Sequence, residues 1–137
     1  MDISIVIPLY NEAESLPELM EWINRVLEKR KFEVVFIDDG SKDDSWSVIE
    51  NLKINYPGKV KGIKFARNYG KRAGIQKGFE TSIGAVVFTM DADLQDSPDE
   101  ILAMEKLLLD GEFDLISGWK KERHDPLSKT IPTKLYN

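Results

Sequence analysis

Two carboxylates stand two positions apart in the segment from Val86 to Glu100, VVFTMDADLQDSPDE, directly after an apolar run. Asp91 and Asp93 can converge on one ion, because side chains two positions apart leave a strand on the same side. Carboxylate oxygens suit a hard divalent cation, which can bridge the oxygens of a diphosphate and neutralise charge on it as it leaves. Gln95 continues the spacing with a neutral oxygen. The alternative is a solvated acidic loop.

The third acid of this cluster, Asp96, is assigned to the helix that follows. Ser97 and Glu100 match a capping box, and Pro98 occupies the favoured first helical position. Negative charge is favourable at a helix N-terminus. We therefore expect a two-acid metal site followed by a separate acidic helix start.

The remaining composition restricts which metal such a site would hold. The chain has no cysteine, and His124 is its only histidine, so neither a thiolate site nor a histidine cluster is possible. Oxygen ligands favour magnesium, manganese or calcium.

Four other polar clusters follow the strands that the apolar pattern predicts. They are PLYNE (8–12), DDGS (38–41), ARNYGK (66–71) and GWKKER (118–123). Ligands of open α/β sheets bind beyond the carboxyl ends of the strands, so these clusters are expected at one edge. Each also has a structural explanation, since DDGS is good turn chemistry, and Arg67 and Lys71 suit a solvated helix start. All of these clusters are expected on the same side of the sheet, which makes a purely structural explanation for every one of them less convincing.

The segment after the first strand argues against two common nucleotide-binding classes. PLYNE contains neither the G-x-G-x-x-G fingerprint nor a P-loop, which disfavours dinucleotide oxidoreductases and P-loop NTPases. A phosphoacceptor receiver domain would need an acidic pair here, where the chain has Pro8, Leu9 and Tyr10. A bound nucleotide would therefore need another partner for its phosphates, and a cation on the Asp-x-Asp motif would serve.

The spacing of apolar residues predicts the strands and helices that position these polar clusters. Strands are expected at Ile3 to Leu9, Phe32 to Ile37, Val60 to Phe65, Ala85 to Met90 and Leu115 to Ser117. Near-continuous Ile, Val and Phe in three of them favours strands buried on both faces, as in a parallel sheet. Helical patterns alternate with them, which predicts an α/β fold with right-handed crossovers.

Four helices are expected between the strands. They cover residues 16–27, the segment after Asp43 or Asp44 that contains Trp46, Ile49 and Leu52, residues 70–82, and a segment that begins at Pro98, contains Ile101, Met104, Leu107 and Leu108, and ends before Gly111. Ser15 and Glu18 match a capping box for the first. The third is the weakest pattern because glycines dilute it.

Length and charge bound the function classes. The 137 residues suit one domain, and the net charge of −5 argues against general nucleic-acid binding. From Gly118 onward five basic and two acidic residues give +3, so this tail suits a phosphate or an anionic membrane surface, or is simply solvated. No secretory signal or transmembrane run is visible, so the segment is expected to be soluble and cytoplasmic. About twenty residues follow the fifth strand, too few for another layer, so the domain is expected to be truncated at Asn137.

Three motifs in order, SIVIPLYNE, FIDDGS and TMDADLQDSPDE, resemble family 2 glycosyltransferases of the GT-A fold. Within that family they look most like the dolichyl-phosphate mannose synthase and bacterial polyprenyl-phosphate glycosyltransferase subfamily. The resemblance extends from Ser4 to about Gly118. It implies a Rossmann-like nucleotide-sugar-binding half, and inverting transfer of one sugar from a UDP- or GDP-linked donor.

The resemblance also implies roles for individual residues in donor binding. Pro8, Tyr10 and Glu12 match the nucleotide pocket after the first strand, and Asp38 and Asp39 match the acidic pair that holds base and ribose.

The motif DAD, formed by Asp91, Ala92 and Asp93, matches the site for Mg²⁺ or Mn²⁺ and the diphosphate, with Gln95 as a companion ligand. Arg67 and Lys71 resemble the basic loop near the donor.

The resemblance implies that the acceptor is a polyprenyl phosphate at the inner face of a membrane. A phosphate monoester is mostly anionic at pH 7, so it needs cations rather than a general base, and Lys120, Lys121 and Arg123 are the candidates. Many relatives have an Arg in a G-S-R pattern where this chain has Lys120, which keeps the charge but loses bidentate geometry. Arg123 is a possible compensation.

The expected organisation is a nucleotide-sugar-binding part at residues 1–117 and the start of an acceptor region at 118–137. No catalytic base is identified, and a homo-oligomer is possible. Two alternatives stay open for the function, which are a nucleotide-sugar-binding module without catalysis and a transferase that acts on a saccharide hydroxyl.

Overall fold

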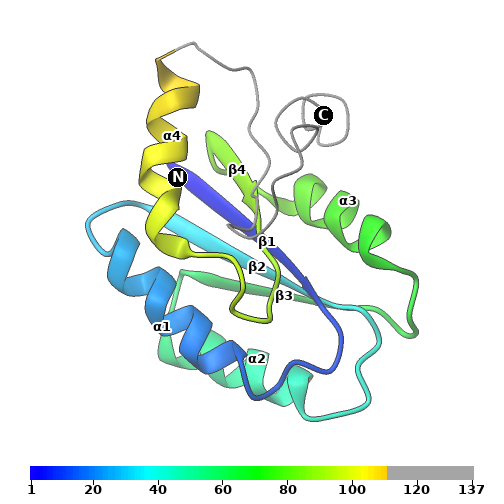
Figure 1. The fold of residues 1–137 in the computed structure, drawn as a ribbon. Helices are drawn as coiled ribbons and strands as arrows, with labels where there is room; N and C mark the ends of the chain where they lie inside the picture. Colours follow the sequence, from blue (N-terminus) through cyan, green and yellow to red (C-terminus); the bar gives the residue numbers. More distant parts are fainter. Residues whose placement is uncertain (111–137) are drawn as a thin grey trace.

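A computed structural model describes residues 1–110 of the chain (Figure 1). In chain order the elements are β1 (Ile3–Leu9), α1 (Leu16–Leu27), β2 (Phe32–Asp38), α2 (Ser45–Asn55), β3 (Val60–Lys64), α3 (Lys71–Thr81), β4 (Val86–Thr89), the 3-10 turn η1 (Pro98–Glu100) and α4 (Ile101–Leu109). The predicted alternation of strands and helices is confirmed. The fifth predicted strand, Leu115 to Ser117, lies outside the described residues.

The four strands form one parallel sheet in the order β3-β2-β1-β4. β1 lies between β2 and β4, pairing Ile3 with Phe32 on one side and with Val86 on the other. All seven residues of β1 and all seven of β2 are buried, as expected for strands covered on both faces. The parallel arrangement brings the carboxyl ends of all four strands to one edge.

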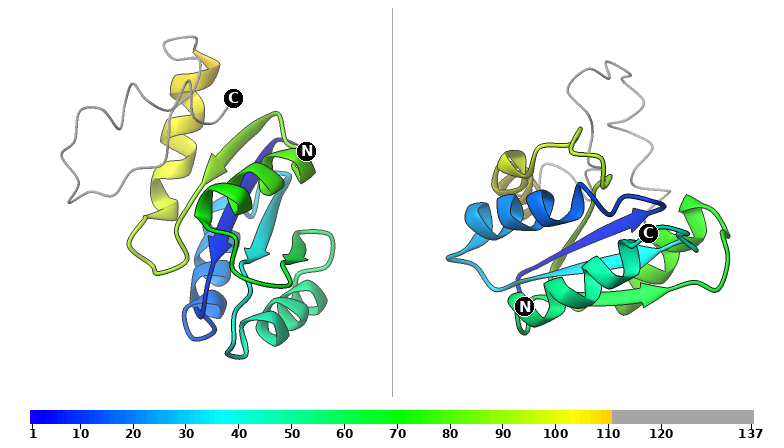
Figure 2. Two further views of the ribbon diagram at one scale, coloured as in Figure 1. Left: turned by 90° about the vertical axis from the view of Figure 1, so that its right-hand side faces the viewer. Right: turned by 90° about the horizontal axis from the view of Figure 1, so that it is seen from below.

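Helices cover both faces of the sheet. Side chains of α1, α2 and α4 pack with alternate strand residues such as Ile5 and Phe36, and the residues between them, such as Val6 and Val35, form a smaller cluster that includes Phe79 of α3. Successive strand side chains point to opposite faces, which explains the division. Figures 1 and 2 show α3, in green, on the side of the sheet away from α1, in blue.

The glycines that weaken the pattern of α3 have a packing role. A Cβ on Gly74 would lie 3.3 Å from Cβ of Pro8, and one on Gly78 would overlap the side chain of Val6. Both glycines are buried and lie four positions apart, on the helix face turned to the sheet. Their missing side chains let α3 approach β1 closely, so the dilution by glycine reflects tertiary packing.

The capping box predicted at the start of α1 is wrong. The Ser15 side chain makes no N-cap hydrogen bond. Its Oγ instead donates to the Ala92 carbonyl at 2.6 Å, 77 positions away. Ser15 therefore joins the first helix to the DAD motif, because a tertiary acceptor competes with the local one.

The predicted cap at Ser97 is formed, and Pro98 begins the helical turn after it as predicted, but this turn is a 3-10 turn. Ser97 Oγ accepts from the Asp99 N–H at 3.3 Å, and this bond starts η1 rather than α4, which begins at Ile101. Asp99 in turn accepts from the Trp22 indole of α1 at 3.0 Å. The acidic turn is thus held against α1.

An ion pair also fixes the position of α4. Both carboxylate oxygens of Glu105 accept from the Arg30 guanidinium at 2.5 Å, and Asp2 lies 3.6 Å from the same group. The bond to Glu105 is the main reason why the pKa of Arg30 lies above its ordinary value. Because α4 follows the DAD loop, this clamp limits where that loop can lie.

A second buried carboxylate lies at the amino ends of the strands. Glu33 of β2 accepts from Ser4 Oγ at 2.5 Å and from the Ile83 N–H at 2.8 Å, and its other oxygen lies 2.7 Å from Lys61 Nζ. Burial acts most strongly on the pKa of Glu33 and raises it, but the hydrogen bonds that it accepts, first of all from Lys61, outweigh burial and hold that pKa below its ordinary value. This network ties the segment before β4 to β1 and β2.

None of the helices within residues 1–110 combines the length and the apolar character needed to cross a membrane.

Candidate donor-binding site

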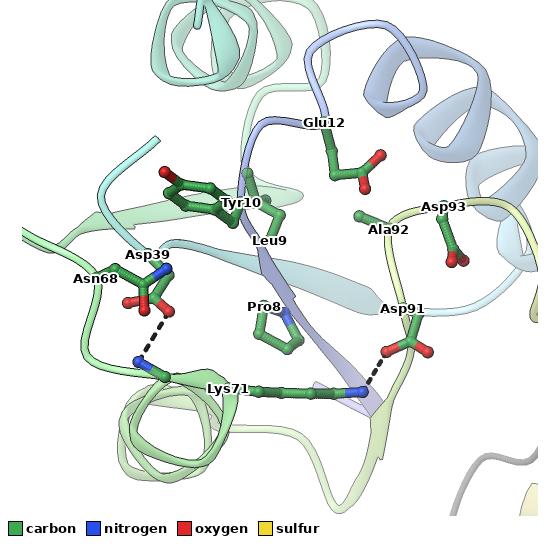
Figure 3. Close-up of a pocket in the computed structure, with 11 residues that line it drawn as sticks. Pro8, Leu9, Tyr10, Glu12, Asp39, Asn68, Lys71, Asp91, Ala92 and Asp93 are labelled. Carbon is green, nitrogen blue, oxygen red and sulfur yellow. Dashed lines mark hydrogen bonds and ion pairs between the residues drawn. The ribbon is translucent and has the colours of Figure 1, made fainter. Parts of the chain in front are cut away.

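A pocket of about 410 Å³ opens beyond the carboxyl ends of β1, β2 and β4 (Figure 3). It is lined by Pro8, Leu9, Tyr10, Glu12, Asp39, Asn68, Gly70, Lys71, Asp91, Ala92 and Asp93. These residues come from four segments far apart in the sequence, and each segment was predicted at this edge. The fold therefore brings all four segments together in one pocket.

The loop after β1 is held by the loop after β2. Asn11 has a φ of 54°, its N–H donates to Ser41 Oγ at 2.8 Å, and its side-chain oxygen accepts from the Lys42 N–H at 2.8 Å. The next N–H, of Glu12, donates to Ser45 Oγ at 3.0 Å. This double connection fixes the backbone that carries Tyr10 and Glu12 into the pocket.

Asp43 completes the connection between these loops. Its carboxylate accepts from the Ser45 N–H at 2.9 Å and from the Ala13 N–H at 3.2 Å. Hydrogen bonding from Ser45, aided by the bond from Ala13, lowers the pKa of Asp43 against the opposing effect of partial burial. The negative charge that Asp43 keeps near neutral pH therefore supports the geometry of the pocket, although Asp43 does not line it.

The two acids at the end of β2, Asp38 and Asp39, have different surroundings. Asp38 is fully buried and does not line the pocket, and one of its oxygens accepts from the Ser41 N–H at 2.8 Å. Asp39 lines the pocket and accepts from the backbone N–H groups of Tyr69 and Gly70 at 2.7 and 2.9 Å. Of the two predicted base and ribose contacts, the structure brings only Asp39 to the pocket surface.

Gly40 allows the turn after β2 to lie against the loop after β3. It has a φ of +78°, and a Cβ there would lie 2.5 Å from the carbonyl carbon of Arg67. Glycine is the residue that satisfies both conditions. The contact places Asn68 and Gly70 at the pocket, two lining residues that were not singled out from the sequence, although both belong to the ARNYGK cluster. Leu9 is a third, and nothing but its place at a strand end indicates it.

The DAD motif lies in a loop that is held by hydrogen bonds within residues 91–96. The Asp91 N–H donates to the Asp96 carboxylate at 2.9 Å, and the Gln95 N–H donates to the Asp93 carboxylate at 3.2 Å. Leu94 between them has a φ of 67°. The assignment of Asp96 to the helix start alone is therefore wrong, because its buried side chain holds the backbone of Asp91.

The donor set fits a metal only in part. Within residues 1–110, no group of three or more His, Cys, Asp or Glu side chains is placed to hold an ion. Asp91 and Asp93 offer two carboxylates to the pocket, whereas Gln95 is exposed and does not line it. Two carboxylates suit a hard cation that takes its other ligands from water and from a diphosphate.

The basic residues of the loop after β3 separate in the structure. Lys71 lines the pocket, and its Nζ lies 2.6 Å from Oδ1 of Asp91 (Figure 3). Arg67 is exposed, does not line the pocket, and stacks over Tyr69 with 4.9 Å between its guanidinium carbon and the ring centre. Lys120, Lys121 and Arg123, the predicted acceptor contacts, lie outside the described residues.

The start of α3 adds a positive end to the pocket. Its N-cap, Gly70, supplies no side-chain cap, and the first turn contains Lys71 and Arg72 but no acid. Cations are unfavourable at the positive end of a helix dipole unless an anion lies nearby. The arrangement is therefore suited to a phosphate group.

Comparison with known proteins decides the family. Residues 4–135 match the model described as Glycosyl transferase family 2. The chain belongs to glycosyl transferase family 2. The family predicted from the three motifs is thereby confirmed.

Two curated relatives of this family 2 chain share one name. The undecaprenyl-phosphate 4-deoxy-4-formamido-L-arabinose transferase of Pseudomonas syringae pv. syringae (strain B728a) is 40% identical, over 98% of this chain and 40% of the relative. The protein of the same name from Shewanella sediminis (strain HAW-EB3) is 39% identical, over 98% of this chain and 41% of the relative. The chain thus spans about 40% of the length of these relatives.

Solved structures support the fold. The mannosyltransferase PcManGT from Pyrobaculum calidifontis, in complex with GDP-Man and Mn²⁺, aligns with a TM-score of 0.71 and 24% identity over 80% of this chain and 32% of that chain. TarS from S. aureus in complex with UDP-GlcNAc aligns with a TM-score of 0.65 and 25% identity over 80% of this chain and 31% of that chain. The predicted GT-A half, with a parallel sheet between helices, is confirmed.

Proposed function

We propose that this family 2 glycosyltransferase binds a nucleoside diphosphate sugar and transfers the sugar, with inversion, to a polyprenyl phosphate. The observation that carries the donor part is the pocket itself, which gathers eight of the residues predicted for donor binding. They are Pro8, Tyr10, Glu12, Asp39, Lys71, Asp91, Ala92 and Asp93. The names of the curated relatives support the acceptor part.

The pocket has a polar end for the nucleoside. Asp39 has both oxygens on backbone N–H groups, yet each carboxylate oxygen can accept a second hydrogen bond. An N–H of uracil or guanine, or a ribose hydroxyl, would supply that donor. Tyr10, 40% exposed at the pocket, offers a ring against which a base can stack.

The diphosphate would lie between the DAD loop and the start of α3. Asp91 and Asp93 would hold Mg²⁺ or Mn²⁺ together with diphosphate oxygens, and the bound metal would neutralise the negative charge of the leaving group. Gly70 and Lys71, at the start of α3, line the same space, and the positive end of the helix favours the same anion. PcManGT, which shares the fold, was solved with GDP-Man and Mn²⁺.

The acceptor is assigned by chemistry and by likeness to the relatives. A polyprenyl phosphate is already anionic at neutral pH, so it needs cations to receive it rather than a base to deprotonate it. We assign that role to Lys120, Lys121 and Arg123. Donor binding is proposed for residues 1–117 and the start of acceptor binding for 118–137, with the protein at the cytoplasmic face of a membrane.

Calorimetry with UDP and with GDP tests the donor site. At least one of them is expected to bind in the presence of Mn²⁺ and to lose affinity when EDTA replaces the metal. Asp93→Ala should lower the metal-dependent affinity by at least on the order of ten-fold, because it removes a metal ligand. Glu50→Ala, an exposed change on α2 away from the pocket, is the matched control. Equal nucleotide affinity with Mn²⁺ and with EDTA would exclude the metal role.

A further inference from the structure

The contact between Lys71 and Asp91 joins the start of α3 to the DAD motif across the pocket (Figure 3). We propose that Lys71 is a built-in counter-cation that occupies Asp91 until a nucleoside diphosphate arrives, so that metal binding depends on donor binding. The inference rests on the proposed function, and it assigns Lys71 a role in the order of binding rather than only in contact with the donor.

The geometry holds the ammonium group in place. Lys71 Nζ lies 2.6 Å from Oδ1 of Asp91, and the Asp91 side chain is only 19% exposed. The residue before Lys71 is fixed, because the Gly70 N–H donates to Asp39 at 2.9 Å. Asp91 is fixed in turn by the bond from its own N–H to Asp96. Both partners therefore project from anchored backbone toward the same point.

Lys71 and a divalent cation compete for the same carboxylate. An ammonium group on Oδ1 and a metal ion on the same side chain would carry like charges within a few ångströms of each other. Their repulsion makes the ion pair and a metal without nucleotide mutually unfavourable. In the absence of donor, Lys71 should therefore weaken metal binding at the DAD motif.

A nucleoside diphosphate removes this conflict. Its negative oxygens can accept from Lys71 and bind the metal at once, and the lysine side chain, 61% exposed, is free to turn from Asp91 to a phosphate. Metal and nucleotide then favour each other's binding by the same factor, as linkage requires. Among the pocket-lining residues of the described chain Lys71 is the only basic one, so this coupling depends on it.

Titration of Mn²⁺, followed by the electron paramagnetic resonance signal of free Mn²⁺, tests the inference. It is done without nucleotide and with saturating UDP or GDP, whichever binds. Lys71→Met should bind Mn²⁺ alone about five-fold more tightly than the wild type, because an exposed ion pair weakens a competitor by about that factor. The same variant should show a smaller increase in Mn²⁺ affinity when nucleotide is added.

Two matched variants separate charge at this point from other effects. Lys71→Arg keeps the positive charge and should keep the weak binding of Mn²⁺ alone. Lys77→Met removes an exposed lysine from the same helix, away from the pocket, and should match the wild type. Circular dichroism confirms that each variant is folded.

The outcomes distinguish this inference from the proposed function. If the wild type shows nucleotide-dependent Mn²⁺ binding but Lys71→Met binds Mn²⁺ alone no more tightly than the wild type, Lys71 is not a counter-cation and the donor site stands. If nucleotide does not raise the Mn²⁺ affinity of the wild type, the metal role in the proposed function fails and this inference fails with it.

Discussion

Two lysine–carboxylate pairs stand at opposite ends of the same parallel sheet. Glu33 and Lys61 lie at the amino ends of the strands, 2.7 Å apart, and Asp91 and Lys71 lie at the carboxyl ends, 2.6 Å apart. The distances are nearly equal, but the surroundings differ. The Glu33 side chain is 1% exposed, whereas that of Asp91 is 19% exposed and lines a pocket.

The difference separates a pair that the fold encloses from a pair that lines a pocket. Glu33 accepts from Ser4 and Ile83 as well as from Lys61, so the chain itself satisfies the buried charge. Asp91 lines the pocket, and our proposal is that a ligand there takes over its partner. A carboxylate that the fold surrounds with donors holds elements together, and a carboxylate that it leaves at a pocket remains available to ions.

The largest expected effect is a difference in how much the two pairs contribute to the free energy of unfolding. Glu33→Gln should lower the free energy of unfolding by about 2 kcal/mol, because it leaves Lys61 and the local donors poorly paired. The loss is below that of a fully buried pair because Lys61 is 40% exposed and can turn to water. Asp91→Asn should change it by less than about 0.5 kcal/mol.

Urea unfolding followed by tryptophan fluorescence measures both changes. Glu80→Gln, an exposed change on α3, is the control for a lost surface charge. Equal losses for Glu33→Gln and Asp91→Asn would contradict the division into a structural and an exchangeable pair.

A smaller effect is expected in α3, the helix that contains Lys71 and packs on β1. Gly78→Ala should lower the free energy of unfolding by about 1 kcal/mol, because the added methyl group overlaps Val6 in a filled core. Alanine is the better helix former by about 1 kcal/mol, so a net loss isolates the overlap. Thermal unfolding compares it with Gln76→Ala, an exposed change on the same helix. A variant more stable than the wild type would show that α3 does not need this close approach.

The smallest expected effect is on acid stability. The pKa values of Glu33 and Asp43 are lowered in the folded chain, so each contributes stability above its unfolded pKa, about 4.3 and 3.9, and loses it as the pH falls through the folded value. The free energy of unfolding should therefore decrease below about pH 5. Urea unfolding at several pH values should show a shallower decrease for Glu33→Gln than for the wild type. An unchanged slope would mean that Glu33 ionises alike in both states.

The sequence predicted the elements well because their signals are local. Buried strands such as Ile3–Leu9 read as continuous apolar runs, and α1 has apolar residues at helical spacing, so both appear where expected. The residues of the pocket were also found in large part, because parallel strands bring their carboxyl ends to one edge. Arg67, Asp38 and Gln95 show the limit of that rule, since a place at a strand end does not determine which way a side chain points.

Contacts between distant segments could not be predicted in the same way. Ser15 looks like a helix cap, yet its hydroxyl bonds to Ala92. Asp96 looks like part of an acidic helix start, yet it holds the Asp91 backbone. Each of these side chains could hydrogen-bond to its own helix start or to a distant segment. Which bond forms depends on which segment the fold brings near.

The amino-acid sequence by itself determined the order of strands and helices, the family, and the acidic motif that a metal and diphosphate would need. Only the tertiary structure decided that Asp39 faces the pocket while Asp38 is buried, and that Lys71 occupies Asp91. The reason is physical. Periodicity and turn chemistry act over a few residues, whereas burial and charge pairing depend on neighbours that lie tens of positions away in the chain.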